Sequence, residues 1–306
     1  MLLSVLALIA VLYDLGFPHS VNHEYWLNNI YALTLTAGIF STVGRYIKYD
    51  TPPRLKVFLF DAISIFFFLT VLGNLLDWFT FPVLFDILKG EGANMNAMAL
   101  VFVREFSALK IDFRRTVLNP AQLFILSFLV IILIGAVLLS LPKATFNGIG
   151  FIDALFTSTS AVCVTGLIVV DTGSYFTEFG QFVILTFIQL GGLGIMTFAS
   201  YFSYFFQGGA SYENQLVLRD MTNSEKLGEV FSTLKRILFI TFIIEASGAL
   251  FIFWSIDSTV IPSLSQRSFF AIFHSISGFC NAGFSTLPNS MYEPAFRFNY
   301  PMHLIL

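Results

Sequence analysis

The sequence predicts an all-α membrane protein that crosses the bilayer several times, and three observations lead to this fold class. Of the 306 residues, 56% are hydrophobic and only 11% are charged, whereas soluble domains are about 25% charged. Apolar runs of ~20 residues, the length that crosses a bilayer as a helix, recur along the chain. A short Ser-rich motif also occurs twice, which indicates an internal repeat. A chain this apolar has too little polar surface to cover a water-soluble globule.

Six apolar stretches predict membrane-spanning helices. They are Met1–Phe17, Tyr25–Gly44, Val57–Leu76, Thr116–Pro142, Phe179–Tyr212 and Ile237–Ile256. A seventh stretch, Ala93–Leu109, is a weaker candidate because Arg104 and Glu105 interrupt its apolar run.

Basic residues predict how these helices are oriented, because cytoplasmic loops carry an excess of Lys and Arg. They gather in three loops: Arg45, Lys48, Arg54 and Lys56 in the first, Lys110, Arg114 and Arg115 in the second, and Arg219, Lys226, Lys235 and Arg236 in the third. The loops on the other side are more acidic and contain Asp153, Asp171, Glu178, Asp257 and Glu293. Placing all three basic loops in the cytoplasm requires an even number of passes before Thr116, which favours a helix at 93–109. The net charge of −3 argues against nucleic acid as a partner.

In this topology, the segment from Lys143 to Glu178 must begin and end on the same side of the membrane, opposite the cytoplasm. Its central part, Phe151–Val170, is nonetheless mostly apolar and small, with the sequence FIDALFTSTSAVCVTGLIVV. We interpret it as a re-entrant segment, in which a short helix dips into the membrane and a non-helical stretch returns. Irregular backbone at membrane depth is tolerated only where it lines a cavity or is buried in protein. The segment therefore indicates a water-filled path.

The motif that occurs twice begins inside this segment. Phe156–Gly166 (FTSTSAVCVTG) and Phe273–Gly283 (FHSISGFCNAG) are offset by 117 residues and are identical at five of eleven positions. Each copy follows a basic pair, an apolar span and a proline. The repeated unit is therefore a span, a re-entrant helix, a loop that ends in Gly, and a second span.

This unit has the properties of a cation filter. The C-terminal end of a re-entrant helix carries a partial negative charge, and the carbonyls of the following loop can replace the water around a cation. Gly166 and Gly283 suit the ends of the loops, because glycine adopts positive φ angles that other residues reach only with strain. The hydroxyls of Ser158, Ser160 and Thr165 are available for freed backbone groups near the first loop.

The stretch TSTSAVCVTGLIVVDTGSYFTEFGQFVILTFIQLGGLGIMTF resembles the first pore repeat of the Trk/Ktr/HKT superfamily of potassium transporters, of the bacterial TrkH type. ISGFCNAGFST resembles the filter of the second repeat, and the resemblance runs from about Asn119 to the end of the chain. It implies that four such units in one polypeptide surround one pore. The filter residues implied here are Cys163, Val164, Thr165, Gly166, Cys280, Asn281, Ala282 and Gly283. Potassium is then expected at the carbonyls of Val164, Thr165, Asn281 and Ala282.

The repeat and the resemblance together divide the chain into four parts. We expect accessory transmembrane helices at 1–111, pore repeat 1 at 112–212, a cytoplasmic linker at 213–234 and pore repeat 2 at 235–306. The second repeat is incomplete, so we expect a truncated chain that lacks repeats three and four. The basic residues that end the first part are irregularly spaced, which favours an accessory bundle over a voltage-sensing helix.

The resemblance also implies partners and a location. We expect membrane lipid, a second copy in a homodimer and a cytosolic nucleotide-binding regulatory subunit as partners. The location implied is the bacterial inner membrane. No cofactor is expected, and K⁺ is the transported ion.

Three features leave alternatives open. Glu245 lies within a span, where a carboxylate is a functional candidate by default; it is either a coupling residue or a buried acid bonded to the pore helix. His274 lies in the second re-entrant helix, and a structural role is favoured over ion coordination. The cluster Gly191, Gly192 and Gly194 predicts either a bend that widens the inner vestibule or close helix packing.

The leading functional hypothesis is potassium uptake across the plasma membrane through a channel-like filter of backbone carbonyls. The alternative is a symporter that couples cation movement to H⁺ or Na⁺ through Glu245. A third hypothesis is a non-conducting receptor or scaffold that keeps the same fold. An enzyme is not expected, because the spans contain no catalytic or metal-ligating constellation.

Overall fold

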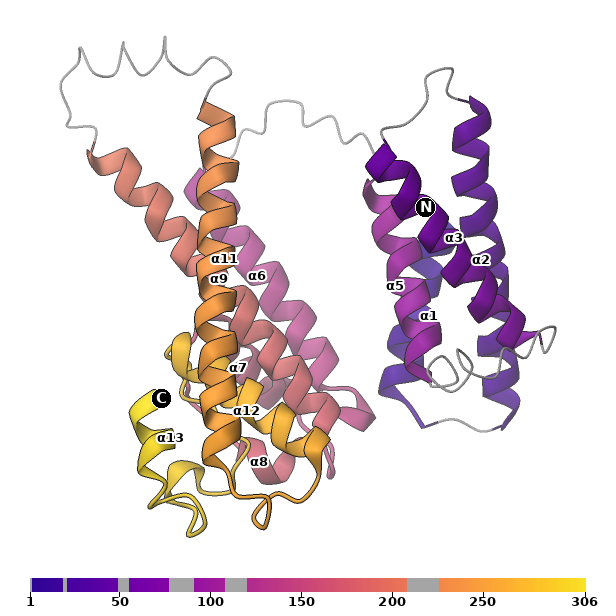
Figure 1. Ribbon diagram of the computed structural model, residues 1–306. Helices are drawn as coiled ribbons and strands as arrows, with labels where there is room; N and C mark the ends of the chain where they lie inside the picture. Colours follow the sequence, from indigo (N-terminus) through magenta and orange to yellow (C-terminus); the bar gives the residue numbers. More distant parts are fainter. Residues whose placement is uncertain (1, 19–20, 49–54, 77–90, 108–119, 208–225) are drawn as a thin grey trace. The chain divides into compact units, whose positions relative to one another are not determined.

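The computed structural model describes residues 2–18, 21–48, 55–76, 91–107, 120–207 and 226–306 (Figure 1). The fold is all-α, as predicted: within these ranges, extended backbone pairs only at an isolated bridge between Thr145 and Phe176. The chain divides into two compact units, Met1–Thr116 and Val117–Leu306. The boundary between the units lies close to the predicted end of the accessory helices at residue 111.

The N-terminal unit consists, in its described residues, of a bundle of long helices. They are α1 (Leu2–Gly16), α2 (Val21–Lys48), α3 (Leu55–Leu75) and α5 (Glu91–Ser107). The weakest of the predicted stretches is therefore helical, and α5 packs against each of the other three helices. Tyr31, Leu35, Phe68 and Met98 are among the buried side chains at the centre.

A buried ion pair explains how α5 accommodates a charge inside this bundle. Asp61 on α3 is 2% exposed, and its Oδ2 lies 2.6 Å from Nη2 of Arg104 on α5. The same oxygen accepts a hydrogen bond of 2.6 Å from the hydroxyl of Tyr46 on α2. Because a buried carboxylate is costly unless it is paired, Arg104 and Tyr46 stabilise Asp61 and connect three helices.

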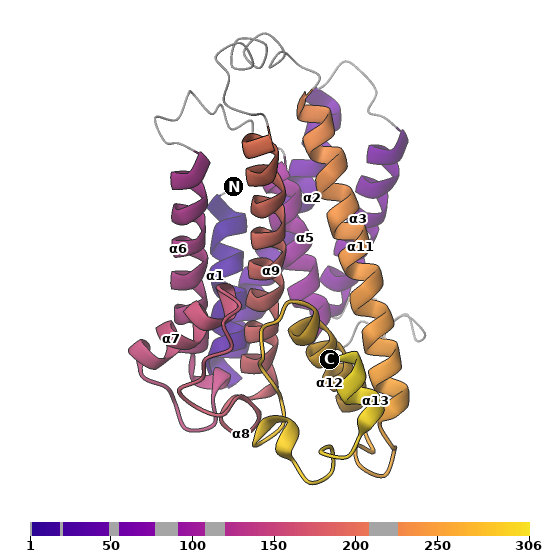
Figure 2. The same ribbon diagram turned by 90° about the vertical axis from the view of Figure 1, so that its left-hand side faces the viewer.

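The second unit contains three long helices and two shorter ones that carry the repeated motif. The long helices are α6 (Pro120–Leu139), α9 (Glu178–Gln207) and α11 (Lys226–Ser255), and the shorter ones are α7 (Phe151–Val162) and α12 (Leu264–Phe279). The connections contain η1 (Pro142–Ala144), α8 (Thr172–Tyr175), η2 (Ser290–Tyr292) and α13 (Tyr300–Ile305). Figure 2 shows α9 between α6 and α11, with α7 and α12 near the same end of these helices.

The boundary of one element, α11, differs from the predicted one. Helix α11 begins at Lys226, so that residues 226–234 of the predicted linker are helical. Helix α13 begins at Tyr300, where the second span of repeat 2 is expected to start, and Asn299 caps it by accepting the N–H of Met302 at 3.2 Å. The remaining linker residues, 213–225, lie outside the described residues.

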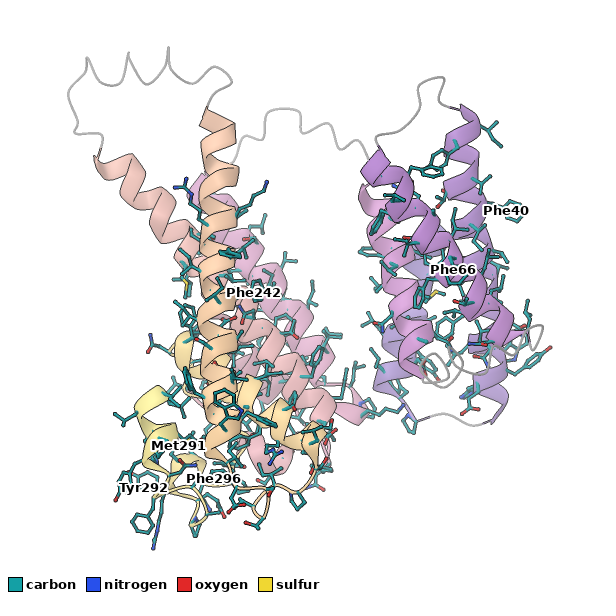
Figure 3. The ribbon with its side chains drawn as sticks, in the orientation of Figure 1. Phe40, Phe66, Phe242, Met291, Tyr292 and Phe296 are labelled. Atoms are coloured by element: carbon teal, nitrogen blue, oxygen red, sulfur yellow. The ribbon has the colours of Figure 1, made fainter. Side chains whose placement is uncertain are left out.

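Three of the described helices are long and apolar enough to cross a membrane, at Val57–Leu75, Glu178–Thr197 and Leu234–Ser255. The apolar parts of α6 and α7 are shorter. Large apolar side chains point outward in both units: Phe40, Phe66 and Phe242, labelled in Figure 3, are 77%, 62% and 55% exposed. Such surfaces suit contact with lipid, and they confirm the membrane class.

The core of the second unit is shared between the two repeats. Leu139 and Ala161 of the first repeat and Ile188 of α9 belong to the same buried cluster as Phe273 and Ala282 of the second. A second cluster joins α11, α12 and the segment around α13, where Phe296 stacks on Phe270 with ring centroids 5.1 Å apart. The loops after α7 and α12 are therefore held by packed helices on several sides.

Candidate functional site

The two loops that the sequence predicts to form a filter are Cys163–Gly166 after α7 and Cys280–Gly283 after α12, and we call them the candidate filter loops. The first of them begins with a left-handed helix cap. Helix α7 ends at the cap residue Cys163, and Val164 has φ 56°. The N–H of Val164 donates to the carbonyl of Ala161 at 3.2 Å, and the N–H of Thr165 donates to Ser160 at 2.9 Å. These two bonds form a Schellman motif, which usually has glycine at its left-handed position. A β-branched residue is strained there, so Val164 stores strain at the loop.

The second filter loop has the same cap. Helix α12 ends at Cys280, and Asn281 has φ 57°. The N–H of Asn281 donates to Gly278 at 3.0 Å, and the N–H of Ala282 donates to Ser277 at 2.7 Å. Every donor and acceptor lies 117 residues after its counterpart in the first loop. The sequence repeat is therefore also a repeat of backbone geometry.

The sign of φ alternates along both loops. Gly166 has φ 70° and Gly283 has φ 71°, and each lies two positions after the left-handed cap residue of its loop. The residue between them, Thr165 or Ala282, does not have a positive φ. In an ordinary strand, successive carbonyls point to opposite sides. The alternating sign of φ shows that neither loop continues as an ordinary strand, in which every φ is negative. Because the N–H groups of the cap are already bonded to the pore helix, the carbonyls of the loops remain available.

The two loops meet at their glycines. A Cβ atom on Gly166 would overlap the carbonyl oxygen of Ala282 and lie 3.3 Å from Cα of Gly283. A Cβ on Gly283 would lie 3.7 Å from Cα of Gly166. The structure thus brings together the ends of two motifs that the sequence separates by 117 residues.

A serine in each of the two short helices, α7 and α12, anchors its helix to the long helix before it. We call α7 and α12 the pore helices, and α6 and α11 the outer helices. In the first repeat, the Ser158 hydroxyl donates to the carbonyl of Ile132 on α6 at 2.8 Å. It occupies the space where a Cβ on Gly135 would lie. The expectation that Ser158 serves backbone groups of the loop is wrong, because its hydroxyl points to α6. The hydroxyl of Thr165, a residue of the loop itself, donates to Oγ of Ser160 at 3.1 Å.

The second repeat has the equivalent contact on α11. The Ser275 hydroxyl donates to the carbonyl of Glu245 at 2.6 Å, and Gly248 provides the space. Ser275 follows Ser158 by 117 residues, but Glu245 follows Ile132 by only 113. The connection between the outer helix and the pore helix is therefore four residues longer in the second repeat. Comparing the two repeats at a fixed offset of 117 residues therefore misses this contact. The sequence signal that finds it is a Gly in the outer helix paired with a Ser in the pore helix, with a connection of variable length between them.

The glycine cluster of α9 provides close packing. A Cβ on Gly191 would overlap the carbonyl of Val162, and a Cβ on Gly192 would lie 2.5 Å from Sγ of Cys280. Gly194 similarly faces an aromatic ring of α6. Helix α9 continues through all three positions. The packing interpretation therefore accounts for these glycines, and α9 lies directly behind both filter loops.

His274 is a structural residue of the second pore helix. It is 1% exposed, with Nδ1 2.8 Å from the carbonyl of Phe270 and Nε2 2.9 Å from Oγ of Ser285. A carbonyl only accepts, so we assign the proton to Nδ1, and Nε2 accepts from Ser285. Both ring nitrogens are thus used within the protein, and His274 ties the loop after the filter to α12.

Glu245 has a different partner from the one expected. Its carboxylate is 4% exposed and accepts a hydrogen bond of 3.1 Å from Nε2 of Gln189 on α9. The prediction of a side-chain hydrogen bond to the pore helix is wrong, because Ser275 of α12 donates to the backbone carbonyl of Glu245 and the carboxylate accepts from Gln189. Gln189 lies 56 residues before Glu245 and belongs to the first repeat, so the bond joins the two repeats.

Two of the acidic residues in the loops predicted to lie outside, Asp171 and Asp257, have structural contacts. Asp171 caps α8 by accepting the N–H of Ser174 at 2.8 Å, and it also accepts the N–H of Asn289 at 3.4 Å. Asp257 accepts the N–H of Thr259, and this hydrogen bond lowers the pKa of its exposed carboxyl below the usual value. The Asp171 contact connects the outer loops of the two repeats.

Residues 92–305 match the family model of TrkH, described as a cation transport protein. The chain belongs to the TrkH family of cation transport proteins. The matched range contains nearly all of α5 and the whole described pore unit, whereas α1, α2 and α3 precede it. The filter loops and their anchors are therefore features of the family region of the chain.

Curated relatives of this family match the same part. Ktr system potassium uptake protein B of Bacillus subtilis is 41% identical over 175 residues, which cover 56% of this chain and 38% of that protein. Potassium/sodium uptake protein NtpJ of Enterococcus hirae is 38% identical over 57% of this chain and 39% of its own length. Ktr system potassium uptake protein D of Bacillus subtilis is 37% identical over 61% of this chain and 42% of its own length. The chain thus spans about two fifths of the length of these relatives.

Proposed function

We propose that this chain supplies two pore units of a potassium uptake protein, in which K⁺ crosses the membrane through a filter of backbone carbonyls. The observation that carries this proposal is the shared backbone of the two loops. Both have alternating φ signs, both are capped by the same two hydrogen bonds, and they touch at Gly166 and Gly283.

The carbonyls of Val164, Thr165, Asn281 and Ala282 are the proposed ligands of the ion, and those of Cys163 and Cys280 continue the same path. Carbonyl oxygens suit K⁺ because they replace its hydration shell without adding a fixed charge. The C-terminal ends of α7 and α12 precede these residues and favour a cation through their dipoles. The Gly166 and Gly283 positions let the backbone turn at positive φ.

The names of the relatives support the choice of ion, since each of the three contains the word potassium. One name also contains sodium, which makes the preference between K⁺ and Na⁺ the property to measure. We further propose a bacterial inner-membrane location, a homodimer and a cytosolic nucleotide-binding regulatory subunit. Additional pore units complete the ring, and residues 1–111 form an accessory bundle.

The test is transport by the protein expressed with all of its natural sequence and reconstituted into liposomes. We expect K⁺-dependent uptake with a preference for K⁺ over Na⁺. Gly166→Ser should reduce that preference at least about tenfold, because a loss of ~1.4 kcal/mol of discrimination corresponds to a factor of ten. The control is Gly148→Ser, a glycine with φ 75° in open space, where the same strain occurs away from the filter. An unchanged ion preference in Gly166→Ser would refute the filter.

A second candidate function is a symporter that couples K⁺ movement to H⁺ or Na⁺ through Glu245. The observation that favours it is a buried carboxylate within a span, since such groups often belong to ion or proton pathways. An imposed proton or sodium gradient should then drive K⁺ uptake in wild-type liposomes. The same gradient should have no effect on Glu245→Gln.

A further inference from the structure

The pore unit contains a buried carboxylate without a basic partner. Oε2 of Glu245 accepts from Gln189, while its Oε1 and the Oε1 of Gln189 are both buried without a hydrogen-bond partner. Among the described residues, no Lys, Arg or His pairs with Glu245. Its carboxyl group is buried, and its hydrogen-bond donor is the side-chain amide of Gln189. A neutral amide compensates only a small part of a buried negative charge.

The N-terminal unit shows how the same chain treats a carboxylate that serves only the fold. Asp61 is as deeply buried as Glu245, and it has the guanidinium of Arg104 at 2.6 Å in addition to the hydroxyl of Tyr46. A buried charge costs several kcal/mol unless a counter-charge lies next to it. An ionised Glu245 therefore requires a counter-charge other than the described side chains.

Glu245 lies directly behind the second filter loop. Its backbone carbonyl accepts the hydroxyl of Ser275 in the pore helix. Gln189 is one helical turn before Gly192, which packs against Cys280 Sγ, and the Glu245 carboxylate is near enough to interact electrostatically with the Cys280 thiol. The cation that passes the neighbouring carbonyls is consequently a positive charge within reach of this carboxylate.

The environment of Glu245 suits a carboxylate, but the fold does not require one at this position. Gln189 donates its NH₂ group to the carboxyl group, which accepts this bond in its ionised form. The equivalent position of the first repeat is Ile132, whose carbonyl makes the same contact to a serine, so the fold needs no carboxylate there.

We propose that Glu245 is an ionised electrostatic positioning residue whose charge is balanced by the cation in the filter, and that it thereby raises the affinity of the second repeat's loop for K⁺. This inference rests on the proposed filter. Glu245 contacts no ion; it acts through the low-dielectric space behind Cys280, and Gln189 holds it in place. Because its counterpart in the first repeat is Ile132, the first repeat provides no equivalent charge at this position.

The test is K⁺ binding and uptake by the protein with all of its natural sequence. Binding is measured as the K⁺-dependent rise in thermal stability in detergent, since a ligand of the native state stabilises it. A unit charge one helix diameter (~10 Å) away, at an effective dielectric constant of ~20, changes cation affinity roughly tenfold. We therefore expect Glu245→Gln to raise the half-saturating K⁺ concentration about tenfold, and Glu245→Asp to leave it within about twofold of wild type.

Asp257→Asn is the matched control, because it removes an exposed carboxylate that follows the same helix, α11. Its half-saturating K⁺ concentration should stay near the wild-type value. If Glu245→Gln does not fold, Glu245→Met removes the charge with a side chain of similar length, and the same rise is expected. A folded charge-removing variant with wild-type K⁺ affinity overturns the inference and leaves the filter intact. No K⁺ response in the wild type overturns both.

Discussion

The two pore repeats differ in sequence far more than in backbone. Only five of eleven motif residues are identical, yet the left-handed residues at the caps have φ 56° and 57° and the glycines have φ 70° and 71°. The capping hydrogen bonds are equivalent one by one. What the repeats share is thus the path of the backbone, the glycine at the end of the loop and the serine that anchors the pore helix.

The repeats differ in what surrounds this common backbone. Val164 occupies the left-handed cap position in the first repeat and Asn281 in the second. The backbone carbonyl that accepts the hydrogen bond of the anchoring serine belongs to Ile132 in the first repeat and to Glu245 in the second. A filter built from carbonyls tolerates such differences, because its ligands do not depend on side-chain identity. The differences therefore indicate where each repeat is adjusted separately.

The largest expected difference between the repeats concerns the two filter glycines. Alanine at either position adopts positive φ at a cost of about 1–2 kcal/mol. At Gly166 the new Cβ would in addition overlap the carbonyl oxygen of Ala282, whereas at Gly283 its nearest neighbour would be 3.7 Å away. We expect Gly166→Ala to abolish K⁺ preference and Gly283→Ala to weaken it only partly. Competition between K⁺ and Na⁺ for uptake into liposomes measures both.

An equal loss of K⁺ preference in Gly166→Ala and Gly283→Ala would contradict this comparison. It would mean that the strain of positive φ dominates and that contact between the loops is unimportant. Gly148→Ala again serves as the control, since it introduces the same strain where the added Cβ meets nothing within 4 Å.

Sequence patterns predicted the helices and the position of the loops, because apolar runs and charge clusters reflect burial in lipid directly. The contact partners of Glu245 could not be predicted in this way. Gln189 lies on another helix in the preceding repeat, and nothing in a local pattern couples residues 56 positions apart. The anchor between Ser275 and α11 was missed because the outer helices are offset by 113 residues and not by 117. Val164 was missed as a left-handed residue because Val is normally excluded from that conformation.

The serine anchors give the next prediction, with an expected effect of about 1–3 kcal/mol. A Cβ on Gly248 would lie 2.5 Å from the Ser275 hydroxyl and 3.6 Å from its Cβ, so Gly248→Ala should destabilise the pore unit by steric overlap. Ser275→Ala alone loses one hydrogen bond, about 0.5–1.5 kcal/mol. The double variant should be more stable than the sum of the two predicts, because removing the hydroxyl makes room for the methyl group.

A double-mutant cycle of thermal unfolding in detergent measures this coupling. The same cycle at Gly135 and Ser158 should show a weaker rescue, since a Cβ on Gly135 would also lie 3.1 Å from the ring of Phe187. Strict additivity at Gly248 and Ser275 would show that the two residues do not share space.

The smallest expected effect separates the two cap positions. Asn adopts left-handed backbone more readily than other non-glycine residues, because its short side chain bonds locally. Val is disfavoured there by its branched Cβ. Asn281 is exposed, so Asn281→Val changes little packing and should lower stability by about 1 kcal/mol. Val164→Asn relieves the strain but loses the apolar contact between Val164 and the core. Its gain in stability should therefore be smaller than the loss of stability in Asn281→Val.

Melting temperatures of the two variants, measured without K⁺ to exclude ion binding, distinguish these effects. If Asn281→Val were as stable as wild type, the left-handed cap would carry no strain, and the difference between Val164 and Asn281 would need another cause.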